Sequence, residues 1–332
     1  MTTQKSELQL AQLQSFVAPY EKPDWGRAIW QIANSLLPLI AVWYLMYRSL
    51  DVSYAITLLL ALPAAGFFIR IFIIQHDCGH GSFLPSQRAN DFIGRCCGVF
   101  TLTPYRYWRR FHAAHHATSG KLDHRAGYDI PTLTVREYKA LSSWSRFKYR
   151  LSRHPLLLFG LGSTIHFALL QRLPFLPPRT WTRERASIWW TNVGIAAVYG
   201  MLIYLLGWRA VVLIQAPITV IASAVGLWLF YVQHQFEDTY WQSDATWSFA
   251  AAGMVGSSYY KLPAVLQWFT GNIGLHHIHH VSVRVPNYRL QQCLDERPVF
   301  SKAPLTLWTS LRCASLKLWD EENERLVPLR KA

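Results

Sequence analysis

The chain has 332 residues, of which 51% are hydrophobic and 16% charged, whereas a typical soluble domain has about 25% charged residues. This balance argues against a soluble protein with one large core and predicts an integral membrane protein. The net charge is +14, which suits nucleic acid, anionic lipid or an acidic protein as partner. The distribution of that charge, described below, favours a membrane and an acidic protein, and we expect no nucleic-acid partner.

Four apolar runs are each long enough to cross a bilayer, which takes about 20 residues. A short connection joins the first run to the second, and another joins the third to the fourth. We therefore expect four transmembrane helices in two hairpins. Prolines fall within three of the runs, and membrane helices tolerate them. The runs cover residues 29–47, 54–75, 186–208 and 210–232.

The distribution of basic residues predicts the orientation of these spans. The segment 76–186 contains 17 Lys and Arg residues, whereas the two expected hairpin turns on the other side contain one each, Arg48 and Arg209. By the positive-inside rule, the middle segment and both termini face the cytoplasm. We expect one domain over residues 1–332, which divides into a cytoplasmic segment (1–26), spans 1 and 2 (about 29–75), a cytoplasmic segment (76–185), spans 3 and 4 (about 186–232) and a cytoplasmic tail (233–332).

One further apolar segment, residues 156–171, tests this topology. If it crossed the membrane, His234 would lie on the opposite side from His80. The segment has only 16 residues and is flanked by Arg153 and Arg172, so we expect an interfacial or re-entrant helix. The shorter apolar segment 93–103 is interpreted in the same way.

Ten of the thirteen histidines fall into four groups beside these spans. Spacings of three or four residues place imidazoles on one face of a helix, and imidazole is a common ligand of iron, zinc, copper and nickel. So many histidines suit two metal ions rather than one. His277 is turned about 100° from His276 on a helix, so its membership is the least certain. The groups are His76 and His80; His112, His115 and His116; His234 alone; and His276, His277, His279 and His280.

Four stretches of sequence around these histidines resemble the histidine boxes of the membrane fatty acid desaturase family, especially bacterial and cyanobacterial acyl-lipid members of the Δ5 or Δ12 (omega-6) type. The stretches are His76-Asp-Cys-Gly-His80-Gly-Ser, Phe111-His-Ala-Ala-His-His-Ala-Thr-Ser-Gly120, Phe230-Tyr-Val-Gln-His-Gln-Phe-Glu237 and Gly271-Asn-Ile-Gly-Leu-His-His-Ile-His-His280.

The resemblance implies an oxygen-dependent enzyme that introduces a cis double bond into a fatty acyl chain of a membrane phospholipid or glycolipid. It implies an all-α membrane protein whose cytoplasmic helical cap carries a non-haem di-iron centre, with O2 as co-substrate. The implied iron ligands are His76, His80, His112, His115, His116, His234, His276, His279 and His280.

This sequence departs from part of the family at one position. The animal acyl-CoA desaturases have an asparagine four residues before the histidine that matches His234, and this asparagine contacts a metal through water. Here that position is Phe230. The difference favours the acyl-lipid branch over the acyl-CoA branch.

Three carboxylates lie near the proposed ligands in sequence: Asp77, Asp123 and Glu237. They are candidates to accept the free N–H of a metal-bound imidazole, an arrangement that fixes the ring. The alternative is that they are ordinary solvated or helix-capping carboxylates. His124, His154 and His166 lack the cluster spacing and are not expected to bind metal.

Desaturation with O2 requires two further electrons, and the sequence contains no haem, iron–sulfur or dinucleotide motif. We therefore expect a separate electron donor, ferredoxin or a similar small redox protein. The basic cytoplasmic segments would suit an acidic redox protein and anionic headgroups. The alternative is that this charge only sets the membrane topology.

Two other functions remain open from the sequence. A di-iron hydroxylase of alkanes, carotenoids or sterols would share the ligands and differ in inserting oxygen. A metal transporter or sensor would need polar or ionisable residues at membrane depth. The only charged residue within the four runs is Arg70, which lies near one end and can extend toward the headgroups.

Overall fold

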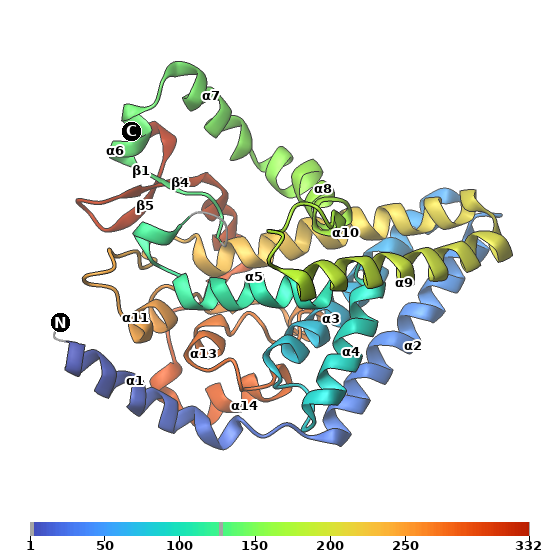
Figure 1. The fold of residues 1–332 in the computed structure, drawn as a ribbon, viewed down its shortest axis with the longest axis horizontal. Helices are drawn as coiled ribbons and strands as arrows, with labels where there is room; N and C mark the ends of the chain where they lie inside the picture. The colour runs from blue at the N-terminus through green and yellow to red at the C-terminus, as the bar shows by residue number, and fades with distance from the viewer. Residues whose placement is uncertain (1–2, 126–128, 332) are drawn as a thin grey trace.

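The computed structural model describes residues 3–125 and 129–331, and these residues form a predominantly helical protein (Figure 1). Four of the described helices are long and apolar enough to cross a membrane, as the sequence predicts. They are α2 (Trp25–Ser49), α3 (Tyr54–His80), α9 (Thr182–Leu206) and α10 (Trp208–His234).

The long helices run toward one end of the molecule, whereas most of the short elements gather at the other end (Figure 1). Helix α3 is the most buried of the four, and it packs against both α2 and α10. Helix α9 lies beside α10 and is the most exposed. Side-by-side packing of α3 and α10 brings the last turns of both helices close together.

Helices α3 and α10 extend past the expected C-terminal ends of their apolar runs into the histidines. Helix α3 continues past residue 75 to His80 and ends at Gly81, whose φ of 72° is the left-handed conformation that glycine adopts most easily. Helix α10 continues past residue 232 to His234. Hydropathy marks where side chains become polar, but the backbone hydrogen bonds of the helix continue through the polar residues. The last turn of α3 therefore carries His76 and His80, and the last turn of α10 carries His234.

The apolar segment 156–171 is not one of the helices long enough to span. It forms a π-helical stretch, Leu156–Gly162, followed by α8 (Ser163–Ala168) and a 3-10 turn, Leu170–Arg172. Both α8 and the π-helical stretch pack against α10. The other segment expected to be interfacial, 93–103, falls largely within α4 (Gln87–Phe100).

The remaining α-helices are shorter than the four long helices. Helix α13 is completely buried, and the N-terminal helix α1 packs against it. The other α-helices are α1 (Thr3–Val17), α5 (Tyr105–Thr118), α6 (Val135–Ala140), α7 (Ser143–Ser152), α11 (Phe249–Met254), α12 (Ala264–Phe269), α13 (His276–Val281), α14 (Asn287–Glu296) and α15 (Leu307–Ser310).

Two small sheets join distant segments. In the first, β4 pairs in parallel with β1 and antiparallel with β5, with Leu133 opposite Leu318. In the second, β2 and β3 pair in parallel, with Tyr260 opposite Leu305. The strands are β1 (Leu133–Thr134), β2 (Tyr260–Lys261), β3 (Leu305–Thr306), β4 (Leu316–Asp320) and β5 (Arg325–Pro328).

Candidate metal centre

All nine histidines that the sequence singles out converge on one region, where they form two groups. Within each group, one potential ligand atom per residue lies within 4.8 Å of all the others. The first group contains five residues, His76, His80, His112, His116 and His279, and the second contains four, His115, His234, His276 and His280.

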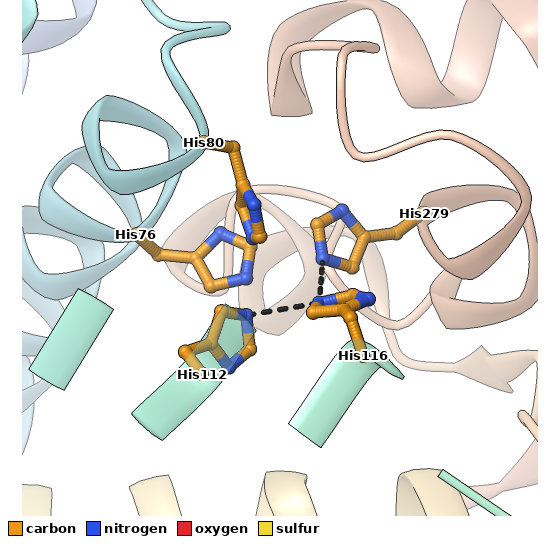
Figure 2. A group of neighbouring side chains, drawn as sticks. All are labelled: His76, His80, His112, His116 and His279. Carbon is orange, nitrogen blue, oxygen red and sulfur yellow. Dashed lines mark hydrogen bonds between the residues drawn. The ribbon is translucent and has the colours of Figure 1, made fainter. Parts of the chain in front are cut away.

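The first group draws on three helices, and its rings point toward one another (Figure 2). The last turn of α3 supplies His76 and His80, and the last turns of α5 supply His112 and His116. The fifth residue, His279, comes from α13. Nε2 of His116 lies 3.1 Å from Nε2 of His112 and 3.2 Å from Nε2 of His279.

The second group is built from α5, α10 and α13. Nε2 of His234 lies 3.1 Å from Nε2 of His115 and 3.0 Å from Nε2 of His276. Nε2 of His280 lies 3.1 Å from that of His276. The two groups are adjacent: the ring of His116, from the first group, stacks on the ring of His280, from the second, with centroids 4.1 Å apart.

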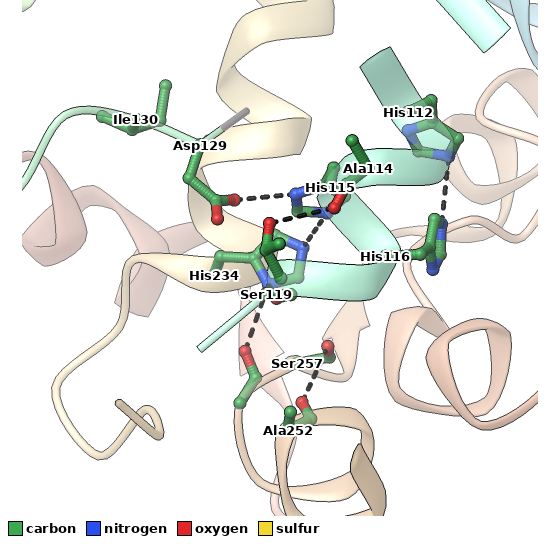
Figure 3. Close-up of polar contacts among 12 residues, drawn as sticks. His112, Ala114, His115, His116, Ser119, Asp129, Ile130, His234, Ala252 and Ser257 are labelled. Atoms are coloured by element: carbon green, nitrogen blue, oxygen red, sulfur yellow. Dashed lines mark hydrogen bonds and ion pairs between the residues drawn. The ribbon is translucent and has the colours of Figure 1, made fainter. Parts of the chain in front are cut away.

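Hydrogen bonding at the outer nitrogens shows why the second group suits a cation. Nδ1 of His115 lies 2.7 Å from the Asp129 carboxylate (Figure 3), and Nδ1 of His234 lies 3.2 Å from the carbonyl oxygen of Gly256. These oxygens only accept, so in the neutral form of each ring Nδ1 carries the proton and Nε2 presents a lone pair. Two Nε2 lone pairs therefore face each other at 3.1 Å. Such a contact is unfavourable unless a cation lies between the nitrogens.

The separations between nitrogens also fit coordination. Two imidazole nitrogens about 2.1 Å from one ion and about 90° apart would lie about 3.0 Å from each other. Five Nε2 pairs within the two groups are 3.0 to 3.2 Å apart. In addition, Nε2 of His80 is buried and has no protein partner among the described residues. The residues present therefore fit two metal ions bound by nitrogen.

Burial favours the uncharged form of five of these rings. It lowers the pKa of His112, His116, His276, His279 and His280 well below the usual range, and the neighbouring imidazoles lower it further. A neutral imidazole is the form that binds metal. These rings are therefore available as ligands at neutral pH.

Two glycines allow the close packing of this region. A β-carbon on Gly79 would lie 2.9 Å from a ring carbon of Trp108, whose indole stacks on His112 with centroids 4.6 Å apart. A β-carbon on Gly274 would lie 2.2 Å from the carbonyl oxygen of Tyr260. Glycine at these two positions lets α3 approach α5 and lets the turn before α13 pass β2.

One of the three expected carboxylates contacts a histidine of the groups. Asp77 is buried, and one of its oxygens lies 2.9 Å from Nδ1 of His76. Its other oxygen accepts hydrogen bonds from the backbone N–H and side-chain amide of Asn287, at 2.6 and 2.8 Å. Asp77 thus fixes His76 and the start of α14 at the same time.

The other two candidate carboxylates, Asp123 and Glu237, have partners other than the grouped histidines, which favours the alternative that they are ordinary solvated carboxylates. Asp123 accepts a hydrogen bond from the backbone N–H of Asp244, and Glu237 lies 3.8 Å from Arg325. Proximity in sequence misleads here because both residues follow the end of a histidine-bearing helix, where the chain turns toward the surface.

The sequence analysis missed Asp129, the carboxylate that holds His115. Its side chain is 4% exposed. Burial raises the pKa of Asp129, but its interactions with His115 and His234 together lower it more, so the pKa is below its usual value. No motif marks this residue. The one available signal is a single acid directly before the apolar pair Ile130 and Pro131.

The remaining histidines lie outside both groups. Nε2 of His277 is 2.9 Å from the carbonyl oxygen of Phe300, which agrees with its doubtful membership. His124 pairs with Asp244, and His166 lies 3.0 Å from the amide of Gln171.

A cavity of about 730 Å³ adjoins both histidine groups. Its lining is mainly apolar and comes mostly from α3, α5, α8, α10 and the π-helical stretch. His76 and His112 of the first group, and His115 and His276 of the second, form part of its wall. Phe230, the position that departs from the animal acyl-CoA pattern, also lines it, with its ring 5.0 Å from that of His115. Such a cavity suits an apolar ligand held against the metal groups.

Known proteins match most of this chain. The family profile described as "Fatty acid desaturase" matches residues 52–310. A protein of Bacillus subtilis (strain 168) named "Fatty acid desaturase" is 44% identical over 331 residues, which cover 99% of this chain and 94% of the relative.

Cyanobacterial relatives match at lower identity. An "sn-1 acyl-lipid omega-3 desaturase (ferredoxin)" of Nostoc sp. is 26% identical, covering 74% of this chain and 69% of the relative. An "sn-1 oleoyl-lipid 12-desaturase" of Synechocystis sp. is 27% identical, covering 66% and 62%. With its four long apolar helices, its two histidine groups and these matches, the chain belongs to the fatty acid desaturase family.

Proposed function

We propose that the protein is an acyl-lipid desaturase that uses O2 and two irons to introduce a cis double bond into a fatty acyl chain of a membrane lipid. The reaction removes two hydrogen atoms from adjacent methylenes, and O2 is reduced to two waters with two further electrons and two protons. The iron pair would supply the strong oxidant that an unactivated C–H bond requires and that protein side chains cannot provide.

The observation that carries this proposal is the convergence of nine histidines into a group of five and a group of four, within each of which one potential ligand atom per residue lies within 4.8 Å of all the others. In this proposal the nine histidines are the ligands, five for one iron and four for the other. Asp77 and Asp129 hold His76 and His115 in the orientation that binds metal.

The cavity supports an acyl substrate. Its volume lies within the range of about 300–1,000 Å³ for small-molecule sites, and aromatic and aliphatic side chains such as Phe72, Leu158 and Leu227 line it. An apolar wall binds a methylene chain by burial of its surface and keeps water from the reacting carbons. The acyl-lipid names of the cyanobacterial relatives agree with this substrate class.

We further propose that residues 1–332 act as one catalytic domain, with the four long helices in the membrane and the metal centre on its cytoplasmic side. The concentration of Lys and Arg in the segment 76–186 supports this orientation. Ferredoxin or a similar acidic redox protein would deliver the electrons, as the name of the Nostoc relative indicates for that protein.

Expression in a host that makes only saturated and monounsaturated chains tests the proposal. The expected result is a new double bond, located by gas chromatography of derivatised fatty acids, together with about two irons per purified chain. Hydroxylated fatty acids as the only new product would assign a hydroxylase instead. Unchanged lipids in a host that supplies ferredoxin and contains iron-loaded protein would contradict the proposal.

A further inference from the structure

A second cavity, of about 370 Å³, lies on the other side of α3 from the acyl cavity and shares no lining residue with it. Two buried polar side chains of the long helices line it, Gln31 of α2 and Arg70 of α3, which are 3% and 7% exposed. The rest of its wall comes from the region of α12 and α14: Ala264, Gln267, Trp268, Asn272, Asn287, Tyr288 and Gln291.

The guanidinium of Arg70 has no anionic partner among the residues that the structure describes. It lies 3.9 Å above the ring of Trp268 and donates one hydrogen bond to the backbone carbonyl of the same residue. Its Nε has no partner, and no ion pair joins Arg70 to a carboxylate within residues 3–125 and 129–331. A buried cation is costly unless it is paired and hydrogen-bonded.

The cavity offers donors and no negative charge. None of the nine residues that line it is acidic. Nε2 of Gln31 is buried without a partner, so this amide and the guanidinium of Arg70 both have donor capacity left for a ligand. The amides of Gln267 and Gln291, by contrast, already bond to each other at 2.7 Å. Arginine with further N–H donors is the usual arrangement for binding the oxygens of a phosphate.

The surroundings indicate a lipid as the source of that phosphate. Beside Gln31, Trp30 is 69% exposed, and beside Ala264, Val265 is 67% exposed. Exposed tryptophan and aliphatic side chains next to a basic pocket at the end of a long apolar helix match the interface between headgroups and acyl chains.

We propose that this second cavity binds the phosphate of an anionic phospholipid through Arg70 and Gln31, outside the catalytic cavity. The bound headgroup would lie against Asn287, which bonds to Asp77 and thereby reaches His76. A bound headgroup would stabilise the position of the first turn of α14 next to the metal centre.

Lipid binding to the purified, delipidated full-length protein tests this site without any turnover, so its failure is distinguishable from failure of the proposed desaturation. The probes are phosphatidylglycerol and a galactosyl diacylglycerol, which has no phosphate, and bound lipid is counted by native mass spectrometry. We expect Arg70→Gln to weaken phosphatidylglycerol binding by about tenfold or more and Arg70→Lys to weaken it less.

Arg48→Gln is the matched control, because Arg48 is an exposed arginine at the other end of α2, and it should bind phosphatidylglycerol as the wild type does. If Arg70→Gln does not give monodisperse protein, Gln31→Leu replaces it and should also weaken binding. Wild-type affinity in the variant that folds would overturn the proposal. Equal binding of the galactolipid would do the same, and displacement of phosphatidylglycerol by millimolar inorganic phosphate would assign the site to free phosphate instead.

Discussion

The carboxylate of Asp129 lies 2.7 Å from Nδ1 of His115, and Nε2 of the same ring lies 3.1 Å from Nε2 of His234. A loop residue outside every histidine motif thus sets the orientation and the tautomer of a ring in the four-histidine group. Asp77 does the same for His76 in the five-histidine group.

Replacing Asp129 by Asn should weaken metal binding by about 10- to 100-fold, because a partner that orients a metal-bound imidazole typically contributes this much. Asp123→Asn is the control, since Asp123 contacts the backbone of Asp244 and no grouped histidine. Iron content after dialysis against a graded chelator measures the difference. Equal iron loss in the two variants would remove Asp129 from this role.

Replacing one histidine of each group should abolish product and reduce bound iron. His115→Ala leaves its three partners with an open position, and His279→Ala does the same to the group of five. His277→Ala should have a much smaller effect on bound iron, because this ring bonds to the carbonyl of Phe300. Activity of His276→Ala combined with an inactive His277→Ala would show that the ligand assignment in α13 is wrong.

A larger side chain on α10 that projects into the cavity beside the histidine groups should change which lengths of acyl chain the enzyme converts. Gly226 lines the cavity, and a β-carbon added there meets no atom within 4 Å, so Gly226→Leu should fold and project into the space. We expect conversion of the longest substrates to fall by about tenfold or more, since one methylene changes discrimination by that order.

Gly200→Leu is the matched control, because Gly200 of α9 also faces open space but does not line the cavity. Its product profile, measured by gas chromatography over substrates of increasing length, should equal that of the wild type. An unchanged profile for Gly226→Leu would show that the acyl chain does not pass α10 at this level.

Acid should destabilise the protein partly through His277. Burial, together with the positive charge of Lys302, lowers the pKa of this histidine to about 4. In the unfolded chain this pKa is about 6.5. Between these values the unfolded state binds the proton and the folded state does not, so stability is lost as the pH falls from about 6.5 to about 4.

The contribution is at most about 3 kcal/mol for a shift of this size. His277→Gln retains a donor for the carbonyl of Phe300 and removes the titration, so its unfolding temperature should fall less than that of the wild type between pH 7 and pH 4.5. The other histidines are common to both proteins and cancel in this comparison. Parallel curves would contradict the burial of a neutral His277.

The sequence by itself determined the positions of the four long apolar helices and identified the nine histidines that are candidate ligands. Both depend on local properties: hydropathy over about 20 residues, and spacings that place side chains on one face of a helix. The motif resemblance pointed to the family, which the comparisons then established.

Only the tertiary structure decided how the histidines divide. His115 and His116 are neighbours on α5 but belong to different groups, and His279 and His280 divide in the same way on α13. Adjacent helical residues point about 100° apart, so which ring joins which group depends on how α3, α5, α10 and α13 pack together.

The tertiary structure likewise decided which carboxylates contact the histidine rings. Asp77 follows His76 in the chain, but Asp129 reaches His115 from a separate loop, while Asp123 and Glu237 turn away. Arg70 shows the same dependence: in sequence it is a basic residue near the end of a span, and in the fold it lines the second cavity together with Gln31. Hydrogen bonds and cavities between distant segments depend on how helices pack, and neither hydropathy nor spacing encodes that packing.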